Sequence, residues 1–501
     1  MKREVLRSAA IVFIASFCLL VIEIVAGRIL APHVGVSLYT WTSIIGVVLA
    51  GISIGAWVGG VLADRYDPVA ILPILLTLSA AASFAIVPLS NLVGADVLPL
   101  PETSLMLRVL ALSAIIFFLP SFLLGTISPV AVKMALRDLA QAGHVVGRIY
   151  AVSTVGSILG TFATGFFLIA RFGTHAILIG IACVLLVCAA ATFRRKIAIV
   201  AFLPFAAACV FAWHALQSPL QRGSAYFKET NYFTIRIEHR TKLDGVGKLE
   251  TMVLDHLVHS LNDPASPCSL TYGYLNIFDE LLRWKVQQSQ PLDVLFIGGG
   301  GYTLPRCIEV AFPTARVDVA EIDPEVTAVA YRFMGLPRNT RVHTANEDAR
   351  WFLRRSNRMY DIIFGDAFND ISVPYHLTTR EFILLQKRHL KPGGVLATNI
   401  IDNVPFGDFF PSYLATTRDV FGDDVIVLGD REYYGRGAHS TLLVIAGARG
   451  FQPHERGIVL PKGDVEEAVN RRRWTILTDD YAPVDNLLAP LFAERSRYQK
   501  R

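Results

Sequence analysis

The first 217 residues form a succession of long apolar stretches separated by short polar connections. Seven of these stretches are long enough to cross a lipid bilayer, which takes about 20 residues. They lie at 9–30, 41–62, 69–92, 108–129, 149–170, 174–193 and 197–216. Seven such runs in succession leave no polar face for water, which excludes the buried core helices of a water-soluble protein. The pattern therefore predicts a multi-pass α-helical membrane domain over residues 1–217, whose first stretch is too long for a cleaved signal peptide.

After residue 217 the apolar runs become shorter, and the spacing of apolar residues changes. Two alternating runs within 231–262 flank a glycine-containing connection and predict a β-hairpin. Further along, short apolar runs separated by helical stretches predict strands at 293–298, 316–321, 341–345, 361–366, 394–400, 424–429 and 440–446. Because strands alternate with helices, we expect right-handed βαβ units and a mostly parallel sheet.

Composition separates the same two halves. The whole chain is 53% hydrophobic and 18% charged, with a mean hydropathy of +0.45. Residues 1–217 hold 13 of the 47 Lys and Arg and 7 of the 42 Asp and Glu, so the net positive charge of the chain comes from its apolar half. A basic balance of this origin does not indicate nucleic-acid binding. We expect the lipid bilayer, and no nucleic acid, as a partner.

Lys and Arg near the ends of the apolar stretches predict the orientation of the membrane domain. With the N-terminus inside, ten lie inside (Lys2, Arg3, Arg7, Arg65, Lys133, Arg137, Arg148, Arg194, Arg195 and Lys196) and three outside (Arg28, Arg108 and Arg171). Seven spans then place residues 218–501 outside. A miscounted span would reverse this placement, so the side that the polar half faces stays open.

Small and charged residues within the spans suggest further properties of the membrane domain. Gly51, Gly55 and Gly59 in one span, and Gly156 and Gly160 in another, have the spacing that lets helix backbones approach closely. A tight bundle follows, and a homo-oligomer is a further possibility. Glu23 lies within the first span, where a carboxylate serves either transport or a paired structural role.

The six cysteines form no metal-binding or redox motif. Four of them lie in apolar runs, and only Cys268 and Cys307 fall in the polar half, with no Cys-x-x-Cys anywhere. We therefore interpret all six as small buried apolar residues and expect no metal site.

Polar groups follow four consecutive predicted strands. The first strand runs into Gly298-Gly299-Gly300-Gly301, the second ends at Glu321, the third is followed by Asp348-Ala349, and the fourth ends at Asp366. A glycine turn lets a ligand approach the backbone at a helix N-terminus, and a carboxylate at the end of the second strand can bind both hydroxyls of a ribose. The carboxyl edge of an open α/β sheet is where ligands bind, so these groups predict a nucleoside site.

The chain resembles the spermidine synthases, and nearly its full length resembles their membrane-bound branch of fused transporter-like/spermidine synthase proteins. The motifs that carry the resemblance are Gly147-Arg-Ile-Tyr150, Glu229-x-x-Tyr232, Leu254-Asp255, the glycine turn, Glu321-Ile-Asp-Pro, Asp366-Ala-Phe with Val373-Pro-Tyr-His376-Leu-Thr-Thr379, Leu390-Lys-Pro-Gly-Gly394 and Asp479-Asp480-Tyr-Ala-Pro483. The shorter segment Gly59-Gly-Val-Leu-Ala-Asp64-Arg65 resembles the cytoplasmic loop signature of major-facilitator transporters.

The resemblance implies a domain organisation. A transmembrane helical domain at 1–217 would be followed by a small β subdomain at 218–290. A class I methyltransferase-like, Rossmann-like catalytic domain would occupy 291–450, with a C-terminal extension at 451–501.

The resemblance also implies a reaction. An amine attacks the carbon beside the sulfonium of decarboxylated S-adenosylmethionine, which is a co-substrate rather than a tightly bound cofactor. By this resemblance Asp366 would remove the proton of the amine, Glu321 would hold the ribose, and Asp348 and Ala349 would hold the adenine. Gly298, Gly299 and Gly300 would pass beside the sulfonium, and Tyr274, Asp370 and His376 would face the amine.

The amine half departs from the family pattern. The glycine turn continues as Gly301-Tyr302 where the family has Asp-Gly, Tyr274 is followed by Leu-Asn where the family has His-Glu, and Asn369 replaces an Asp. The leading hypothesis is thus a membrane-tethered aminopropyltransferase in the cell (inner) membrane that acts on a small amine such as putrescine. The alternatives are a methyltransferase-like enzyme with another acceptor, and a transporter or sensor whose nucleoside domain only binds ligand.

Overall fold

A computed structural model gives the structure of the chain. It describes residues 2–35, 37–94, 105–136, 142–193, 223–241, 248–255, 257–367, 373–402, 407–430, 440–454, 456–471 and 474–489. The chain divides into two compact units, a helical unit (Met1–Arg222 with Lys228–Asn231) and an α/β unit (Gly223–Phe227 with Tyr232–Arg501).

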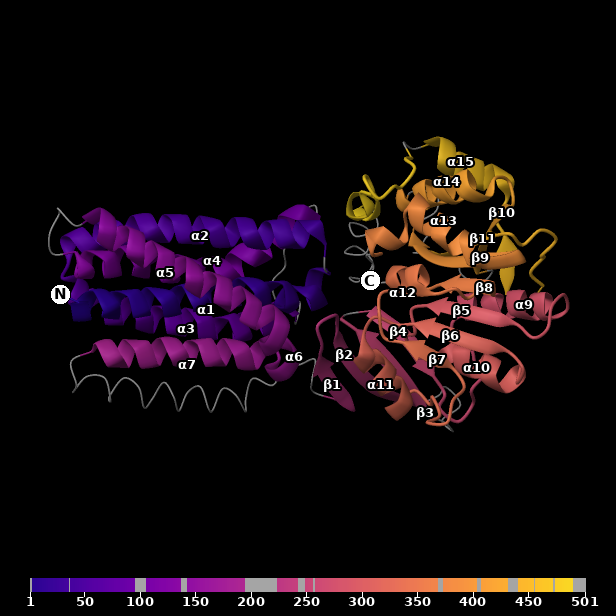
Figure 1. Cartoon of the computed structure of the whole chain (residues 1–501), viewed down its shortest axis with the longest axis horizontal. Coiled ribbons are helices and arrows are strands. Elements are labelled where there is room, and N and C mark those ends of the chain that lie inside the picture. Colours follow the sequence, from indigo (N-terminus) through magenta and orange to yellow (C-terminus); the bar gives the residue numbers. More distant parts are fainter. Residues whose placement is uncertain are drawn as a thin grey trace. The chain divides into compact units, whose positions relative to one another are not determined.

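The helical unit contains six helices that are long and apolar enough to cross a membrane, among the residues described. In chain order the helices are α1 (Lys2–Val34), α2 (Leu38–Arg65), α3 (Pro68–Gly94), α4 (Leu105–Ala135), α5 (Ala142–Ala163), the π-helical turn Thr164–Leu168, α6 (Ile169–Phe172) and α7 (Thr174–Thr192) (Figure 1). The first six predicted spans are confirmed as helices. The seventh, 197–216, lies outside the described residues.

Close backbone packing holds the helices together, as the glycine spacing predicts. A Cβ atom added at Gly51, Gly55 or Gly59 of α2 would overlap atoms of α4, including the Phe122 carbonyl group opposite Gly55. On α5, a Cβ at Gly156 or Gly160 would overlap the backbone of α1. Both groups of glycines therefore pack against helices of the same chain, and a homo-oligomer stays a prediction.

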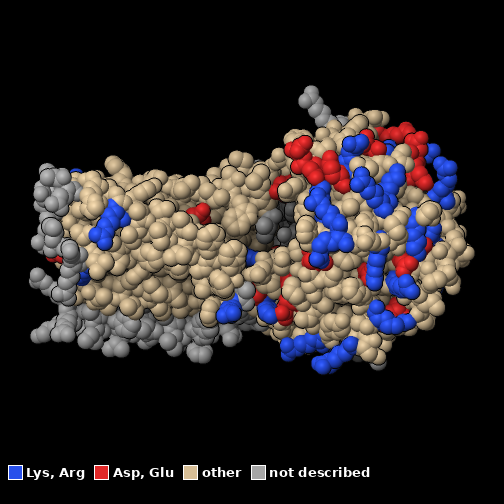
Figure 2. All heavy atoms as spheres, viewed as in Figure 1, with Lys and Arg blue, Asp and Glu red and all other residues tan. Residues whose placement is uncertain are grey.

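Charge is distributed as the composition of the two halves predicts. On the face shown in Figure 2, charged side chains crowd the α/β unit, and the helical unit is almost entirely uncharged along its length. One exposed ion pair of the helical unit joins Asp64 near the end of α2 to Lys133 near the end of α4, with 2.7 Å between Nζ and Oδ1. Asp64 belongs to the segment that resembles a transporter loop.

The α/β unit begins with a four-stranded antiparallel sheet of order β1-β2-β3-β4. Its strands are β1 (Tyr226–Glu229), β2 (Thr234–Thr241), β3 (Lys248–Leu254) and β4 (Leu257–Asn262). The antiparallel pair β2–β3 confirms the predicted hairpin, and β1 and β4 extend it. Alternate residues of β2 and β3, such as Ile237 and its partner Met252, are fully buried and join the main core.

The second sheet has eight strands in the order β12-β10-β11-β9-β8-β5-β6-β7. They are β5 (Asp293–Ile297), β6 (Arg316–Ala320), β7 (His343–Ala345), β8 (Tyr360–Gly365), β9 (Leu390–Asp402), β10 (Val425–Asp430), β11 (Ser440–Ala446) and β12 (Gly457–Val459). Strands β7, β6, β5, β8 and β9 are parallel, whereas β11 runs antiparallel between β9 and β10. The seven predicted strands are confirmed, and this mixed order is that of a Rossmann-like, class I methyltransferase fold.

Helices cover both faces of this sheet. They are α9 (Gly273–Val286), α10 (Thr303–Ala311), α11 (Pro324–Arg332), α12 (Ala349–Arg355), α13 (Arg380–Arg388), α14 (Phe409–Phe421) and α15 (Lys462–Arg471), with a 3₁₀ turn at Tyr375–Leu377. Alternate strand residues point to opposite faces. Phe296 of β5 therefore packs in the core that holds α9, α10 and α11, while Leu295 packs in the core that holds α12, α13 and α14.

A disulfide bond corrects the interpretation of the cysteines. Cys268, in the segment before α9, is bonded to Cys307 on α10, with a Cα–Cα distance of 4.6 Å. The two residues are 39 positions apart, and only the return of the chain across β5 brings them together. The interpretation as buried thiols holds for Cys18, but it is wrong for the exposed Cys183, and the interpretation as separate thiols is wrong for this pair. Cys188 is half-buried, and Cys209 lies outside the described residues.

We expect the Gly55→Ala substitution to destabilise the helical unit by about 1–3 kcal/mol, because the added methyl group overlaps the α4 backbone. The matched control is Gly60→Ala on the same helix, where an added Cβ has no atom within 4 Å. Both changes carry the same intrinsic helix preference. Thermal unfolding of the detergent-purified protein measures the difference, and equal melting temperatures would contradict the packing described here.

Candidate active site

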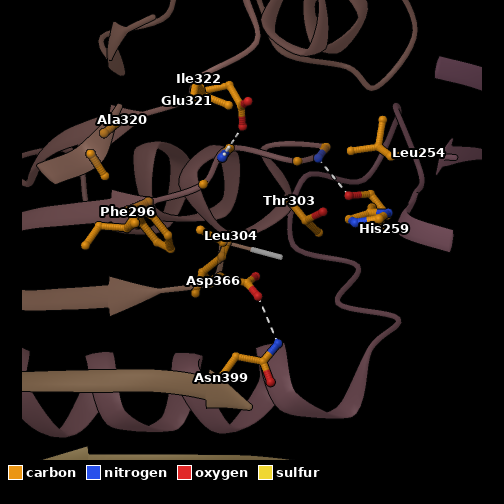
Figure 3. Close-up of a pocket in the computed structure, with 18 of the residues that line it drawn as sticks. Leu254, His259, Phe296, Thr303, Leu304, Ala320, Glu321, Ile322, Asp366 and Asn399 are labelled. Carbon is orange, nitrogen blue, oxygen red and sulfur yellow. Dashed lines mark hydrogen bonds between the residues drawn. The ribbon is translucent and has the colours of Figure 1, made fainter. Parts of the chain in front are cut away.

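A cavity of about 360 Å³ opens at the carboxyl edge of the parallel strands (Figure 3). Its walls come from the ends of β5, β6, β8 and β9, from β4 of the small sheet, and from the start of α9. Sequence reasoning predicted the strand ends as the binding edge. The small sheet and the start of α9 form the opposite wall of the cavity.

The glycine turn forms one wall and is held at both ends. Gly298 has φ +95°, and a Cβ there would collide with the Asp366 backbone, so only glycine fits. The Gly299 N–H donates to the Glu321 carboxylate at 2.8 Å, and the Gly301 N–H donates to Ser260 Oγ at 2.7 Å. Figure 3 shows the bond to Glu321 along the upper rim of the cavity.

Tyr302 directly follows the turn and is unusual in its backbone. It has φ +54°, in the left-handed region that a residue with a Cβ rarely adopts. Its buried ring extends beneath the turn, and its hydroxyl lies within hydrogen-bond distance of Thr327 Oγ1 at 3.0 Å and Thr344 Oγ1 at 3.2 Å. The Tyr302 side chain thus ties the turn to α11 and β7.

Glu321 ends β6 and is almost completely buried. One carboxylate oxygen accepts the Gly299 N–H and the other accepts the Asp323 N–H at 2.9 Å. Burial raises the pKa of Glu321, and the two backbone N–H bonds act against that rise. Each oxygen keeps a second lone pair, so the fixed carboxylate can accept bonds from a ligand hydroxyl in the cavity.

Asp366 follows β8 and faces the cavity opposite the turn. The Tyr274 hydroxyl donates to its Oδ2 at 2.9 Å. Asn399 Nδ2 donates to its Oδ1 at 2.8 Å, and this bond is drawn in Figure 3. Burial raises the pKa of Asp366, while these two hydrogen bonds and the nearby His259 oppose the rise. A carboxyl group in these surroundings can receive a proton, because both of its fixed neighbours are neutral donors.

Asp348 begins α12 and is bonded to His376. Asp348 Oδ1 accepts the N–H groups of Arg350 and Trp351, and Oδ2 lies 2.8 Å from His376 Nε2. The bond to His376 lowers the pKa of Asp348. Arg350 also donates to the His376 carbonyl and pairs with Asp479, so the turn that carries His376 is tied to α12 at the cavity edge.

The structure brings nearly all of the expected site residues to one cavity. Those that line it are Gly298, Gly299, Gly300, Glu321, Asp348, Ala349, Tyr274, Asp366 and His376. Asp370 lies outside the described residues. Their individual roles stay predictions, and within the described ranges no group of His, Cys, Asp and Glu is arranged to hold a metal ion.

Three lining residues were missed from the sequence. Asn399 lies on β9, the next parallel strand beyond β8, and extending the strand-end argument by one strand would have indicated it. Ser260, on β4, supports the glycine turn from another sheet, and Tyr272 lies beside Tyr274 with 6.0 Å between ring centroids. No local pattern marks these two, because their role depends on how the small sheet and α9 meet the strand ends.

Most of the site residues lie within a stretch that matches a known family, whereas Ser260, Tyr272 and Tyr274 precede it. Residues 284–405 match the spermine/spermidine synthase domain. A polyamine aminopropyltransferase of Vibrio vulnificus is 37% identical over 139 residues, which is 27% of this chain and 45% of that protein. A probable polyamine aminopropyl transferase of Bifidobacterium longum is 29% identical over 233 residues, which is 42% of this chain and 52% of that protein. The chain thus spans about half the length of these curated relatives.

Among solved structures, a probable spermidine synthase from Corynebacterium glutamicum aligns with a TM-score of 0.40 at 23% identity. The alignment covers 44% of this chain and 78% of that one. A spermidine synthase in complex with the transition-state analogue AdoDATO aligns with a TM-score of 0.33 at 17% identity, covering 54% and 86%.

The matched residues 284–405 include strands β5 to β9, together with the glycine turn, Glu321, Asp348, Asp366 and Asn399. In this part of its sequence, the chain is thus similar to the spermine/spermidine synthases.

Proposed function

We propose that this protein is a membrane-tethered aminopropyltransferase that transfers the aminopropyl group of decarboxylated S-adenosylmethionine to an amine. The observation that carries the proposal is the buried Asp366 carboxyl group, which faces the cavity and is held by Tyr274 and Asn399. The aminopropyltransferase names of its relatives support the reaction class.

In this proposal the donor lies along the glycine turn. Glu321, fixed by two backbone N–H groups, accepts the ribose hydroxyls, and the adenine lies toward Asp348 and Ala349. The turn has no side chain between Gly298 and Gly301, which leaves room for the sulfonium end of the donor. The positive sulfonium activates the adjacent carbon by itself, so these residues only have to hold it in line with the amine.

The acceptor lies between the turn and α9. Asp366 accepts the proton of the amine, the free nitrogen lone pair forms a bond to the carbon beside sulfur, and the carbon–sulfur bond breaks. The electron pair of that bond stays on sulfur, and neutral methylthioadenosine leaves. Tyr274 and Asn399 keep the carboxyl group aimed at the cavity.

The helical unit supplies the tether in this proposal. Its six long apolar helices would anchor the synthase in the cell membrane as a multi-pass protein. Residues 218–290, 291–450 and 451–501 would act as the β subdomain, the catalytic domain and a C-terminal extension. The hydrophobic lengths and the near-absence of charge along the helices support this.

A methyltransferase is the second candidate. The sheet order is shared with that class, and the acceptor wall contains aromatic and neutral groups such as Tyr232, Tyr272 and Thr441. Incubation of the full-length detergent-purified protein with the decarboxylated donor or with S-adenosylmethionine, and a panel of amines, separates the two. Mass spectrometry should show addition of an aminopropyl group, and products that carry only a methyl group would overturn the proposal.

Glu321→Ala should weaken binding of methylthioadenosine by about 1.5–3 kcal/mol, because it removes charged acceptors for the ribose. Isothermal titration calorimetry measures the affinity. Glu347→Ala is the matched control, since Glu347 follows β7 but pairs with Arg355 and does not line the cavity. Equal affinities of the two variants would remove Glu321 from the donor site.

Asp366→Asn should lower turnover by about 10²–10⁴-fold, because the amide keeps the shape of the side chain but cannot take the proton. Binding of methylthioadenosine should persist, which calorimetry on the same preparation checks. Normal turnover by this variant would show that Asp366 is structural.

The Tyr274→Phe substitution should move the acidic limb of the rate profile to higher pH. Activity needs ionised Asp366, so it is full above the pKa of Asp366 and falls as the pH drops through it. Burial already raises this pKa, and the Tyr274 hydrogen bond opposes the rise, so losing that bond raises the pKa further. Measurement of kcat/KM against pH tests this, and an unmoved limb would contradict the role of Asp366 as proton acceptor.

A further inference from the structure

The disulfide joins two segments that lead to the proposed active site, and one of its two cysteines is exposed. Cys307 is buried on α10, the helix that follows the glycine turn, whereas Cys268 is exposed and precedes Tyr272 and Tyr274. The bond therefore joins two segments of the chain. One leads to Tyr272 and Tyr274, on the side proposed for the amine, and the other is α10, which follows the glycine turn proposed for the donor. Disulfides persist in oxidising compartments and are rare in the cytosol, where thiol reductants would reach an exposed sulfur.

The helices carry an independent indication of sidedness. Six Lys and Arg of the described helices belong to one side in an alternating arrangement of spans. They are Lys2, Arg3 and Arg7 at the start of α1, Arg65 at the end of α2, Lys133 at the end of α4 and Arg148 in α5. The opposite side has only Arg28, Arg108 and Arg171 within the described helices. An excess of Lys and Arg marks the cytoplasmic side, so the ends with Arg28 and Arg171 face away from the cytoplasm.

The segment Lys228–Asn231, which is grouped with the helical unit, lies at the arginine-poor end. Glu229 Oε2 accepts the backbone N–H of Thr174, the first residue of α7, at 2.9 Å, and Oε1 accepts the Thr174 hydroxyl at 3.0 Å. The positive charge of Arg28 is near enough to act on the same carboxyl group. The chain continues from this segment into the α/β unit at Tyr232.

We propose that the α/β unit works on the non-cytoplasmic, oxidising side of the membrane, where the Cys268–Cys307 disulfide persists. This rests on the membrane tether of the proposed function. It follows that donor and amine reach the cavity from that side. The donor is a cationic nucleoside that does not cross a bilayer unaided, so an export or carrier step must supply it.

Reporter fusions to the full chain test the sidedness in bacterial cells. Alkaline phosphatase fused after Arg501 should be active, because the enzyme matures only outside the cytoplasm, and green fluorescent protein at the same position should be dark. Green fluorescent protein placed before Met1 should be bright, which is the matched control for insertion. An inactive phosphatase with bright green fluorescent protein after Arg501 would overturn the proposal.

The thiol state is a second readout on the same membranes. After denaturation, a maleimide-linked polymer should label two more cysteines in reduced protein than in unreduced protein. The Cys268→Ser/Cys307→Ser double variant should show no such difference. Equal labelling of the wild-type chain before and after reduction would show that the pair is reduced in the cell, and would also overturn the proposal.

These outcomes are separable from failure of the proposed reaction. If the reporters show that the C-terminus is cytoplasmic, the sidedness is wrong, but transfer to an amine by the purified protein can still be observed. Absence of transfer, with active phosphatase and a protected disulfide, removes the reaction but keeps the sidedness. Release of the chain from membranes by alkaline carbonate would remove the tether and, with it, this inference.

Discussion

Parallel pairing of β5 with β6 and β8 is the constraint on which the candidate site depends. Because neighbouring parallel strands end at the same edge, the glycine turn, Glu321 and Asp366 must meet although they span nearly 70 positions of the chain. The Gly299–Glu321 bond then joins the first two strand ends, and the Asp366 N–H donates to the Ile297 carbonyl to join the first and fourth. The acidic groups of the cavity are thus positioned by backbone pairing before any ligand binds.

This constraint explains which parts of the site could be predicted from the sequence. Glu321, Asp348 and Asp366 each follow an apolar run, and the position of a strand end is visible in the alternation of strands and helices. Ser260 and Tyr272 could not be found in this way, because they reach the cavity from a separate sheet and from the segment before α9. Their positions depend on the tertiary packing of the small sheet and the segment before α9 against the strand ends, and no periodic sequence pattern connects these elements.

The disulfide was missed for a related reason. Cys268 and Cys307 lie in unlike surroundings, one in a loop and one on a helix, with a complete strand between them. Cysteine spacing carries information when a short motif holds both residues, whereas here the contact is created by the path through β5. The helix packing was easier to predict, since the glycines of α2 and α5 recur at the helical period and each stripe meets a neighbouring backbone.

Tyr302 has a consequence for how tightly the cavity can hold a nucleoside. A residue with a side chain in the left-handed backbone region destabilises the folded state by about 1–3 kcal/mol. Tyr302 is such a residue, and its hydroxyl group anchors the glycine turn through Thr327 and Thr344. A turn that is already ordered loses little conformational entropy when a ligand arrives. The strain at Tyr302 is therefore present from folding onward, and a ligand that binds in the cavity does not have to order the glycines around it.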